Sequence, residues 1–153
     1  MWILLVCGGV ACTLAAMWGD WRWRQVPHWT VAGLLALWLL LAVTAPERLG
    51  FPPWAGAACG VGALALGFLC FRLGLWGAGD AKLLAVLALW IGPHDLPAAL
   101  LGTAAVGLLL LAVALAVPAG DFRKRGLPFA VALTAPAVAV LAARVASLAD
   151  PCA

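Results

Sequence analysis

The chain has 153 residues, of which 67% are hydrophobic and 10% are charged, and its mean hydropathy is +1.12. A soluble domain carries roughly 25% charged residues, so this composition excludes an ordinary soluble protein and predicts an integral membrane protein. The net charge of +3 is too small to indicate nucleic-acid binding. We therefore expect one all-α domain over residues 1–153, a polytopic bundle of membrane helices.

Stretches without charge predict six membrane helices. They cover residues 1–19, 25–46, 49–71, 83–94, 96–120 and 126–143. Five of them have about the length needed to cross a hydrocarbon core of roughly 30 Å. The fourth is too short alone, and we expect it to begin near Ala81 or to be shielded by other helices. The stretch at the N-terminus has no basic region and no convincing cleavage site, so we interpret it as a membrane helix and not as a signal peptide.

Proline and glycine mark the expected breaks between these helices. They are Pro46, Pro52 and Pro53 after the second helix, Gly74, Gly77 and Gly79 after the third, Pro93 and Pro97 after the fourth, and Pro118 and Gly120 after the fifth.

Lysine and arginine predict the orientation. With the loops between the helices numbered from the N-terminus, seven of the nine basic residues lie in odd-numbered loops, and only Arg48 and Arg144 lie on the other side. The positive-inside rule then places the odd loops in the cytoplasm and both termini outside it. Asp20 and Asp80 consequently share the cytosolic side, each at the end of its helix. The orientation depends on lysine and arginine alone, so the placement of both aspartates on one side is independent of it and favours a shared site.

Asp80 is the strongest candidate for a functional residue. It lies in Gly77-Ala78-Gly79-Asp80-Ala81-Lys82, within a chain that otherwise excludes charge. An ionisable residue at membrane depth is costly and indicates function. The glycines allow another chain to approach the carboxylate closely, and the start of a helix favours its anionic form. Lys82 is two positions further on, roughly on the opposite helical face, and we expect it to reach toward lipid phosphates.

Asp20 is the candidate partner. It is followed by Arg22, Arg24, Pro27 and His28. The two arginines can contact headgroups or the nearby carboxylate, and Pro27 suits the start of a helix. Two aspartates that share a proton can supply a base for water and an acid for a carbonyl oxygen, as in aspartic proteases. We expect neither a metal nor another cofactor to be required.

These residues resemble a known family. The stretch 77–85, continuing through Trp90 to Gly92 and Pro93, is similar to the GxGD motif of type IV prepilin peptidases, and looks most like the short form that serves tight-adherence (Flp-type) pili. Asp20, Arg22, Val26 and Pro27 match a second pattern, D-x-R-x-x-x-I-P-N, with His28 in place of Asn. Leu127, Pro128 and Phe129 match the start of a third pattern, L-P-[FY]-G, with Ala130 in place of Gly.

The resemblance implies a bacterial inner-membrane endopeptidase that removes the leader of a prepilin or pseudopilin at the cytosolic face, with Asp20 and Asp80 as catalytic residues. Gly77, Gly79, Lys82, Arg22, Arg24 and Pro27 would support them. The expected partners are the substrate helix and membrane lipids. Long members of the family carry a four-cysteine methyltransferase domain, and the sequence shows neither that domain nor a zinc site, so the resemblance implies cleavage only.

Other polar residues have plainer interpretations. Asp121 lies among Arg123, Lys124 and Arg125, which favours a solvated loop over catalysis. Glu47, Asp95 and Asp150 are expected on the outer surface, and His94 is expected to be structural. His28 is interpreted as an interfacial residue, with a contact to substrate or to Asp20 left open. The five cysteines contain no C-x-x-C pair and are expected to pack as small apolar residues.

Two other functions stay open at this stage. Intramembrane acids also relay protons, so a small proton-coupled transporter subunit is an alternative, although both key acids lie at one face and no inverted repeat is evident. A non-catalytic assembly factor is the other, and it would tolerate amides at both positions.

Overall fold

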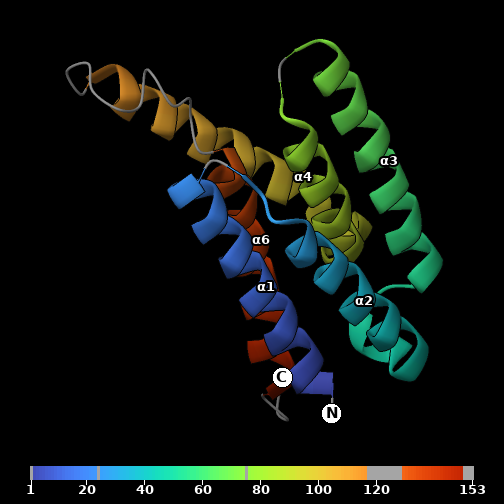
Figure 1. Ribbon diagram of the computed structural model, residues 1–153. Helices are drawn as coiled ribbons and strands as arrows, with labels where there is room; N and C mark the ends of the chain where they lie inside the picture. The colour runs from blue at the N-terminus through green and yellow to red at the C-terminus, as the bar shows by residue number, and fades with distance from the viewer. Residues whose placement is uncertain (1, 24, 75, 117–128, 150–153) are drawn as a thin grey trace.

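The computed structural model describes residues 2–23, 25–74, 76–116 and 129–149, and within them all regular secondary structure is helical. The elements are α1 (Trp2–Trp23), α2 (His28–Thr44), the short 3-10 helix η1 (Pro46–Leu49), α3 (Pro53–Arg72), α4 (Ala78–Ala116) and α6 (Phe129–Ala149). Figure 1 shows α1 and α6 on one side of the bundle and α3 on the other, with the first part of α4 between them. The predicted all-α class is therefore confirmed for the described residues.

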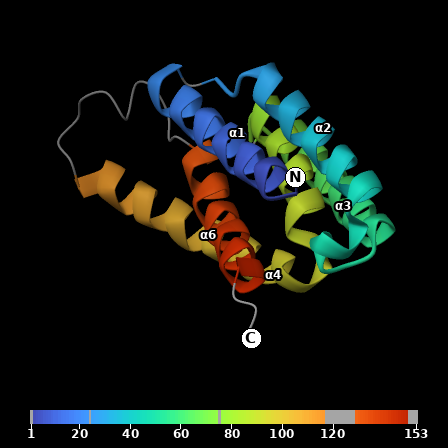
Figure 2. The same ribbon diagram turned by 90° about the horizontal axis from the view of Figure 1, so that it is seen from below.

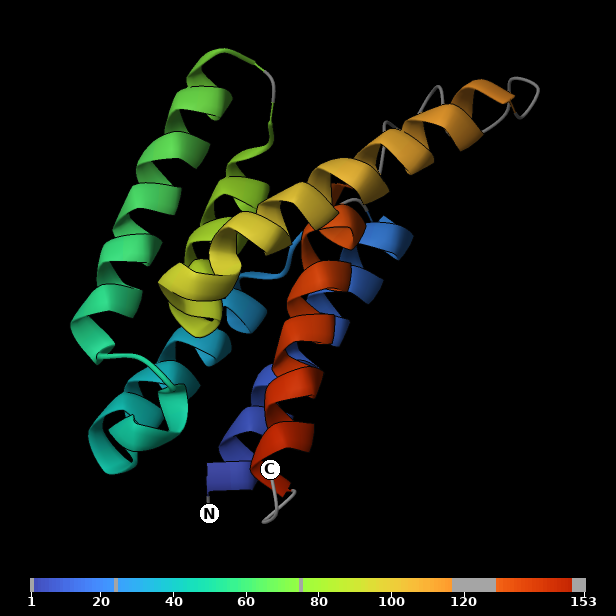
Figure 3. The same ribbon diagram turned by 180° about the vertical axis from the view of Figure 1, so that it is seen from behind.

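Helix α4 is two helices joined at a sharp break. Gly92 has φ 73° and ψ 175°, which is not helical, and the chain reverses direction there (Figure 3). A side chain at Gly92 would collide with the ring of Phe51, so both the backbone angle and the available space require glycine. Pro93 and Pro97 were expected to separate the fourth and fifth helices, but both lie inside helical backbone after Gly92. The break is therefore earlier and tighter than the prolines predicted.

The first part of α4, residues 78–91, forms the centre of the bundle. Its buried side chains run almost without interruption from Leu83 to Ile91, and α3, α2 and α6 all pack against α4. Trp90 is 2% exposed and its indole nitrogen donates a hydrogen bond of 3.0 Å to the carbonyl oxygen of Leu34 in α2. A short helix enclosed by its neighbours needs little lipid contact, which explains why the predicted fourth segment could be so short.

Small residues bring α3 against this central helix. The buried positions of α3 are Gly56, Gly60, Ala63 and Gly67, a stripe on one helical face. A Cβ atom at Gly67 would lie 2.8 Å from the Cβ of Ala81, directly beside Asp80. Close approach through small residues is the usual packing mode of membrane helices, because it maximises van der Waals contact where no hydrophobic force acts between them.

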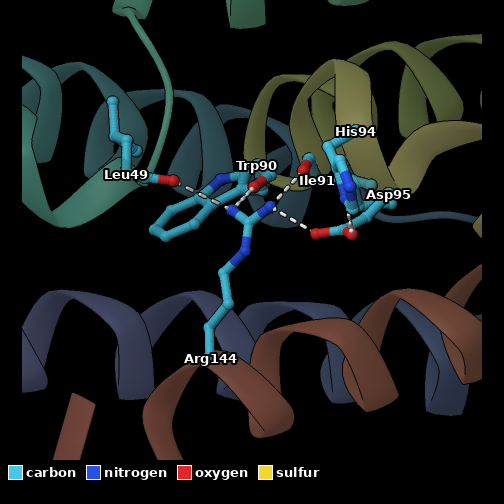
Figure 4. Close-up of polar contacts among 6 residues, drawn as sticks. All are labelled: Leu49, Trp90, Ile91, His94, Asp95 and Arg144. Atoms are coloured by element: carbon cyan, nitrogen blue, oxygen red, sulfur yellow. Dashed lines mark hydrogen bonds and ion pairs between the residues drawn. The ribbon is translucent and has the colours of Figure 1, made fainter. Parts of the chain in front are cut away.

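Arg144 of α6 binds several helices together at the end of the bundle opposite Asp80 (Figure 4). Its guanidinium donates hydrogen bonds to the carbonyl oxygens of Leu49, Trp90 and Ile91 and to the carboxylate of Asp95. It therefore satisfies carbonyls that the break at Gly92 leaves without helical partners. Asp95 also contacts His94 at 2.9 Å, so Asp95, expected as a surface acid, is instead part of an ion-pair cluster.

The apolar surface fits a membrane. Three helices, α1, α3 and α4, are long and apolar enough to cross a bilayer, while residues 28–44 and 129–144 form shorter apolar helices. Large apolar side chains are exposed, among them Leu4, Val43 and Leu115 at 75%, 81% and 79%; an apolar surface of this extent is typical of contact with lipid. The number of spans and the orientation of the termini stay predictions.

Candidate active site

Asp20 lies near the C-terminal end of α1 and is buried, with 7% of its surface exposed. One carboxylate oxygen accepts a hydrogen bond of 3.0 Å from the backbone N–H of Ala130, at the start of α6. That N–H belongs to the first turn of a helix and has no partner within it. The bond therefore satisfies two groups that would be costly to bury alone.

Gly19 allows the segment after α1 to pack closely against the helix beside Asp20. A Cβ atom at Gly19 would lie 2.9 Å from the ring of Pro27 and 3.1 Å from the carbonyl oxygen of Gln25. The segment between α1 and α2 thus folds back against the helix one residue before Asp20. Pro27 stands immediately before α2 with φ −63°, the angle that its ring imposes, and its carbonyl accepts hydrogen bonds from the backbone and hydroxyl of Thr30.

Asp80 lies in the first turn of α4 and is partly exposed. The backbone of Gly77 hydrogen-bonds its carboxylate, and a Cβ atom at Gly77 would lie 3.1 Å from carboxylate oxygen Oδ2. The Ala81 N–H in turn donates to the Gly77 carbonyl at 3.2 Å. Gly77 thus holds the carboxylate against the backbone that precedes it. The predicted place of Asp80 near a helix start is confirmed.

The two carboxylates lie at the same end of the bundle, which is the upper end in Figure 1, and are close enough to interact electrostatically. They come from different helices, α1 and α4, separated by 60 positions in sequence. Two neighbouring carboxylates can share one proton. This arrangement can supply a general base and a general acid to one water molecule.

Val26, in the segment between α1 and α2, closes the space between the two halves of the site. A Cβ atom at Gly79 would lie 3.5 Å from the Cβ of Val26, which is ordinary van der Waals contact. Val26 thus packs against the first turn of α4, which carries Asp80, while its neighbour Pro27 packs against Gly19 beside Asp20. The Val-Pro pair of the second sequence pattern is therefore a structural link between the two motifs.

The start of α6 also borders the site, and the sequence did not predict that its residues would contact those around Asp20 and Asp80. The ring of Phe129 lies 5.0 Å from that of Trp76, just before Gly77, and Ala130 donates to Asp20. Trp76 thus packs on the start of α6. Leu127 and Pro128 lie outside the described residues. Since the contact of Ala130 uses its backbone only, alanine can stand where the pattern has glycine. The position of this motif at a helix start was the feature of the sequence that could have indicated the contact.

The remaining candidates are peripheral or undescribed. Arg22, His28 and Lys82 are exposed, which fits contacts with headgroups or substrate more readily than direct support of the carboxylates. Arg24, Asp121 and the basic residues 123–125 lie outside the described part of the chain. Among the residues that the structure describes, no cluster of three or more His, Cys, Asp or Glu could hold a metal ion.

Comparison with known proteins agrees with this arrangement. A family model described as the type IV leader peptidase family matches residues 7–112, a range that contains Asp20, Asp80 and the glycines around them. Comparison with curated proteins and with solved structures gave no match. Since the family model covers well over half of the chain, the protein belongs to the type IV leader peptidase family.

Proposed function

We propose that this protein is a membrane-embedded aspartic endopeptidase that removes the short leader of Flp-like type IV prepilins at the cytosolic face of the bacterial inner membrane. Membership of a leader peptidase family supports the reaction class. The aspartic mechanism is supported by the placement of Asp20 and Asp80 at the same end of the bundle, close enough to interact electrostatically. The positive charge expected on that side of the membrane supports the cytosolic face.

In the proposed reaction, the ionised carboxylate of the pair takes a proton from water, and the water oxygen attacks the carbonyl carbon of the scissile peptide. The protonated carboxyl gives its proton to the carbonyl oxygen. Collapse of the tetrahedral intermediate breaks the C–N bond. The leaving amine takes a proton from the carboxyl that accepted it from water, and a hydroxyl of the intermediate returns its proton to the other carboxylate. The hydrogen bond from Ala130 holds Asp20 in place throughout. No covalent enzyme intermediate is needed.

The test is co-expression with an Flp-type prepilin, with the shorter mature pilin followed on a gel. Asp20→Asn and Asp80→Asn should each lower cleavage by about a thousandfold, within the range for loss of a general acid or base. The double variant should be scarcely worse than either single variant, because residues that act as a unit are not additive. Glu47→Gln is the matched control, since Glu47 is an exposed acid outside the site, and should cleave normally.

Normal processing by either aspartate variant would contradict the mechanism. A proton flux in liposomes that depends on Asp80, with no cleavage of any prepilin, would instead favour a transporter.

A further inference from the structure

The second part of α4 leaves the bundle and opens a cleft against α6. The two helices are in close contact at Gly102, where a Cβ atom would lie 3.0 Å from Pro136. From there toward Ala116 they diverge, as Figure 2 shows. The cleft has a volume of about 410 Å³ and is lined by Thr103, Ala104, Gly107, Leu108, Leu111 and Phe129, among others. We name it the α4–α6 cleft.

The α4–α6 cleft adjoins the candidate active site at Phe129. Phe129 forms its wall at the wide end, and the ring of Phe129 packs on Trp76 beside the loop of Asp80. The next residue, Ala130, donates to Asp20. A chain lying in the cleft with its end at Phe129 is thus delivered to the carboxylates, whereas the narrow end at Gly102 is closed by Pro136.

The lining fits a helix with an apolar surface. All of the lining residues are uncharged, and the hydroxyl of Thr103 already donates to the carbonyl of Ala99, so the cleft offers no unsatisfied side-chain donor to a polar ligand. Ala104 and Gly107 are small, which lets the backbone of another helix approach closely. Leu108 is 67% exposed and Leu115 79%, leaving the outer part of α4 without a partner among the described residues.

We infer that the α4–α6 cleft docks the apolar helix of the precursor whose leader is cut at the Asp20–Asp80 pair. This inference rests on the proposed function and adds where the substrate helix binds. The occupant is a membrane-spanning helix with small and aliphatic side chains on the face that enters the cleft. Its N-terminal end lies at Phe129, so the leader peptide bond reaches the two carboxylates.

A second cleft provides the control. It has a volume of about 200 Å³ and lies between α3 and α4, lined by Cys59, Gly62, Ala63, Leu66, Leu84 and Leu100, among others. It is equally apolar, but neither α1 nor α6, which supply Asp20 and Ala130, contributes to its lining. Gly62 and Gly107 are matched positions, because a Cβ atom meets nothing within 4 Å at Gly62 and only Phe129 at 3.8 Å at Gly107.

The cleavage experiment fills each cleft in turn. Gly107→Leu and Ala104→Leu should raise KM for the full-length precursor about tenfold with little change in kcat, the signature of lost substrate binding. Both variants should cut a short peptide that spans only the leader junction as the wild-type enzyme does. Gly62→Leu should leave both substrates unaffected. Equal KM for wild-type and Gly107→Leu enzymes on the full-length precursor would overturn the inference.

A capture experiment separates this inference from the proposed function. A photo-crosslinking residue at Leu108, in an Asp80→Asn background, should capture the full-length precursor in membranes, while the same residue at Leu66 should capture only lipid. Capture at Leu108 without any cleavage by the wild-type enzyme would leave the docking site standing and reject the peptidase. Lipid alone at Leu108, or equal capture at both positions, would overturn the docking site even if cleavage is normal.

Discussion

At the scale of single residues, the site depends on backbone geometry as much as on the two acids. Asp20 is held by the N–H of Ala130, and Asp80 by the backbone of Gly77. The sequence could predict the acids and their shared side, because a carboxylate in an apolar chain is conspicuous. It could not predict that a backbone N–H from residue 130 binds Asp20, since any residue but proline has such a group.

The two motif glycines should differ in importance. A side chain at Gly77 would press on the Asp80 carboxylate at 3.1 Å, whereas one at Gly79 would make an ordinary contact with Val26 at 3.5 Å. Gly77→Ala should therefore lower kcat for leader cleavage by about tenfold or more, because small displacements of a catalytic group are costly.

Gly79→Ala, measured in the same cleavage assay, should stay within about twofold of the wild-type rate. The opposite ranking of the two variants would show that Gly77 does not position the carboxylate.

At the scale of elements, the bundle is fixed at its far end by one arginine. Arg144 joins α6, η1 and both parts of α4, so it sets how α6 lies along α4 and thereby where Ala130 meets Asp20. In the sequence, Arg144 stands near the end of an apolar helix, which indicates a function or a buried partner. The count of charges that predicts the orientation does not reveal that partner. Its partners are mostly backbone carbonyl oxygens, and since every residue has one, the sequence cannot indicate which of them Arg144 binds.

Loss of Arg144 should destabilise the protein strongly. Arg144→Ala removes four hydrogen bonds and leaves carbonyls at the break unsatisfied, so the free energy of unfolding should fall by at least about 2 kcal/mol. Thermal unfolding in detergent, followed by circular dichroism, measures this directly.

Asp95→Asn is the matched test of the ion pair. The Asp95 side chain is 33% exposed, and Arg144 keeps its carbonyl partners in this variant. The loss should therefore be about 1 kcal/mol or less. If Arg144→Ala melted at the wild-type temperature, the cluster in Figure 4 would have no structural role.

The charge-free stretches predicted six membrane helices, a number that stays a prediction, and they placed the ends of the helices inaccurately. Among the described residues, α-helix occurs in six segments when α4 is divided at Gly92. The fourth segment begins at Ala78, before the charge-free stretch, because Asp80 and Lys82 lie in its first turns. The break falls at Gly92 because only glycine fits beside Phe51, a tertiary constraint that proline positions do not reveal.

At the scale of the whole molecule, the two acids and the wide end of the proposed docking cleft lie at one end of the bundle. The end with Asp20 and Asp80 also carries the exposed residues Arg22, Arg72 and Lys82, while η1 and Arg144 mark the other (Figure 1). Seven of nine basic residues are expected on the first side, which the positive-inside rule therefore predicts to face the cytoplasm.

Cysteine labelling tests this orientation. In a cysteine-free background, Glu47→Cys should react in intact cells with a thiol reagent that does not cross the inner membrane. Arg72→Cys should react only after that membrane is permeabilised, because Glu47 and Arg72 are exposed at opposite ends of the bundle. Labelling of Arg72→Cys alone in intact cells would reverse the topology and place the acids outside the cytoplasm.

The central claim is that the carboxylates of Asp20 and Asp80 meet. A short bifunctional thiol crosslinker applied to the Asp20→Cys/Asp80→Cys variant, in membranes and without other cysteines, measures this most directly. We expect efficient intramolecular crosslinking, and none for a Glu47→Cys/Asp80→Cys control. Absence of a crosslink between positions 20 and 80, in protein whose two thiols each react with a monofunctional reagent, would show that the two carboxylates do not meet.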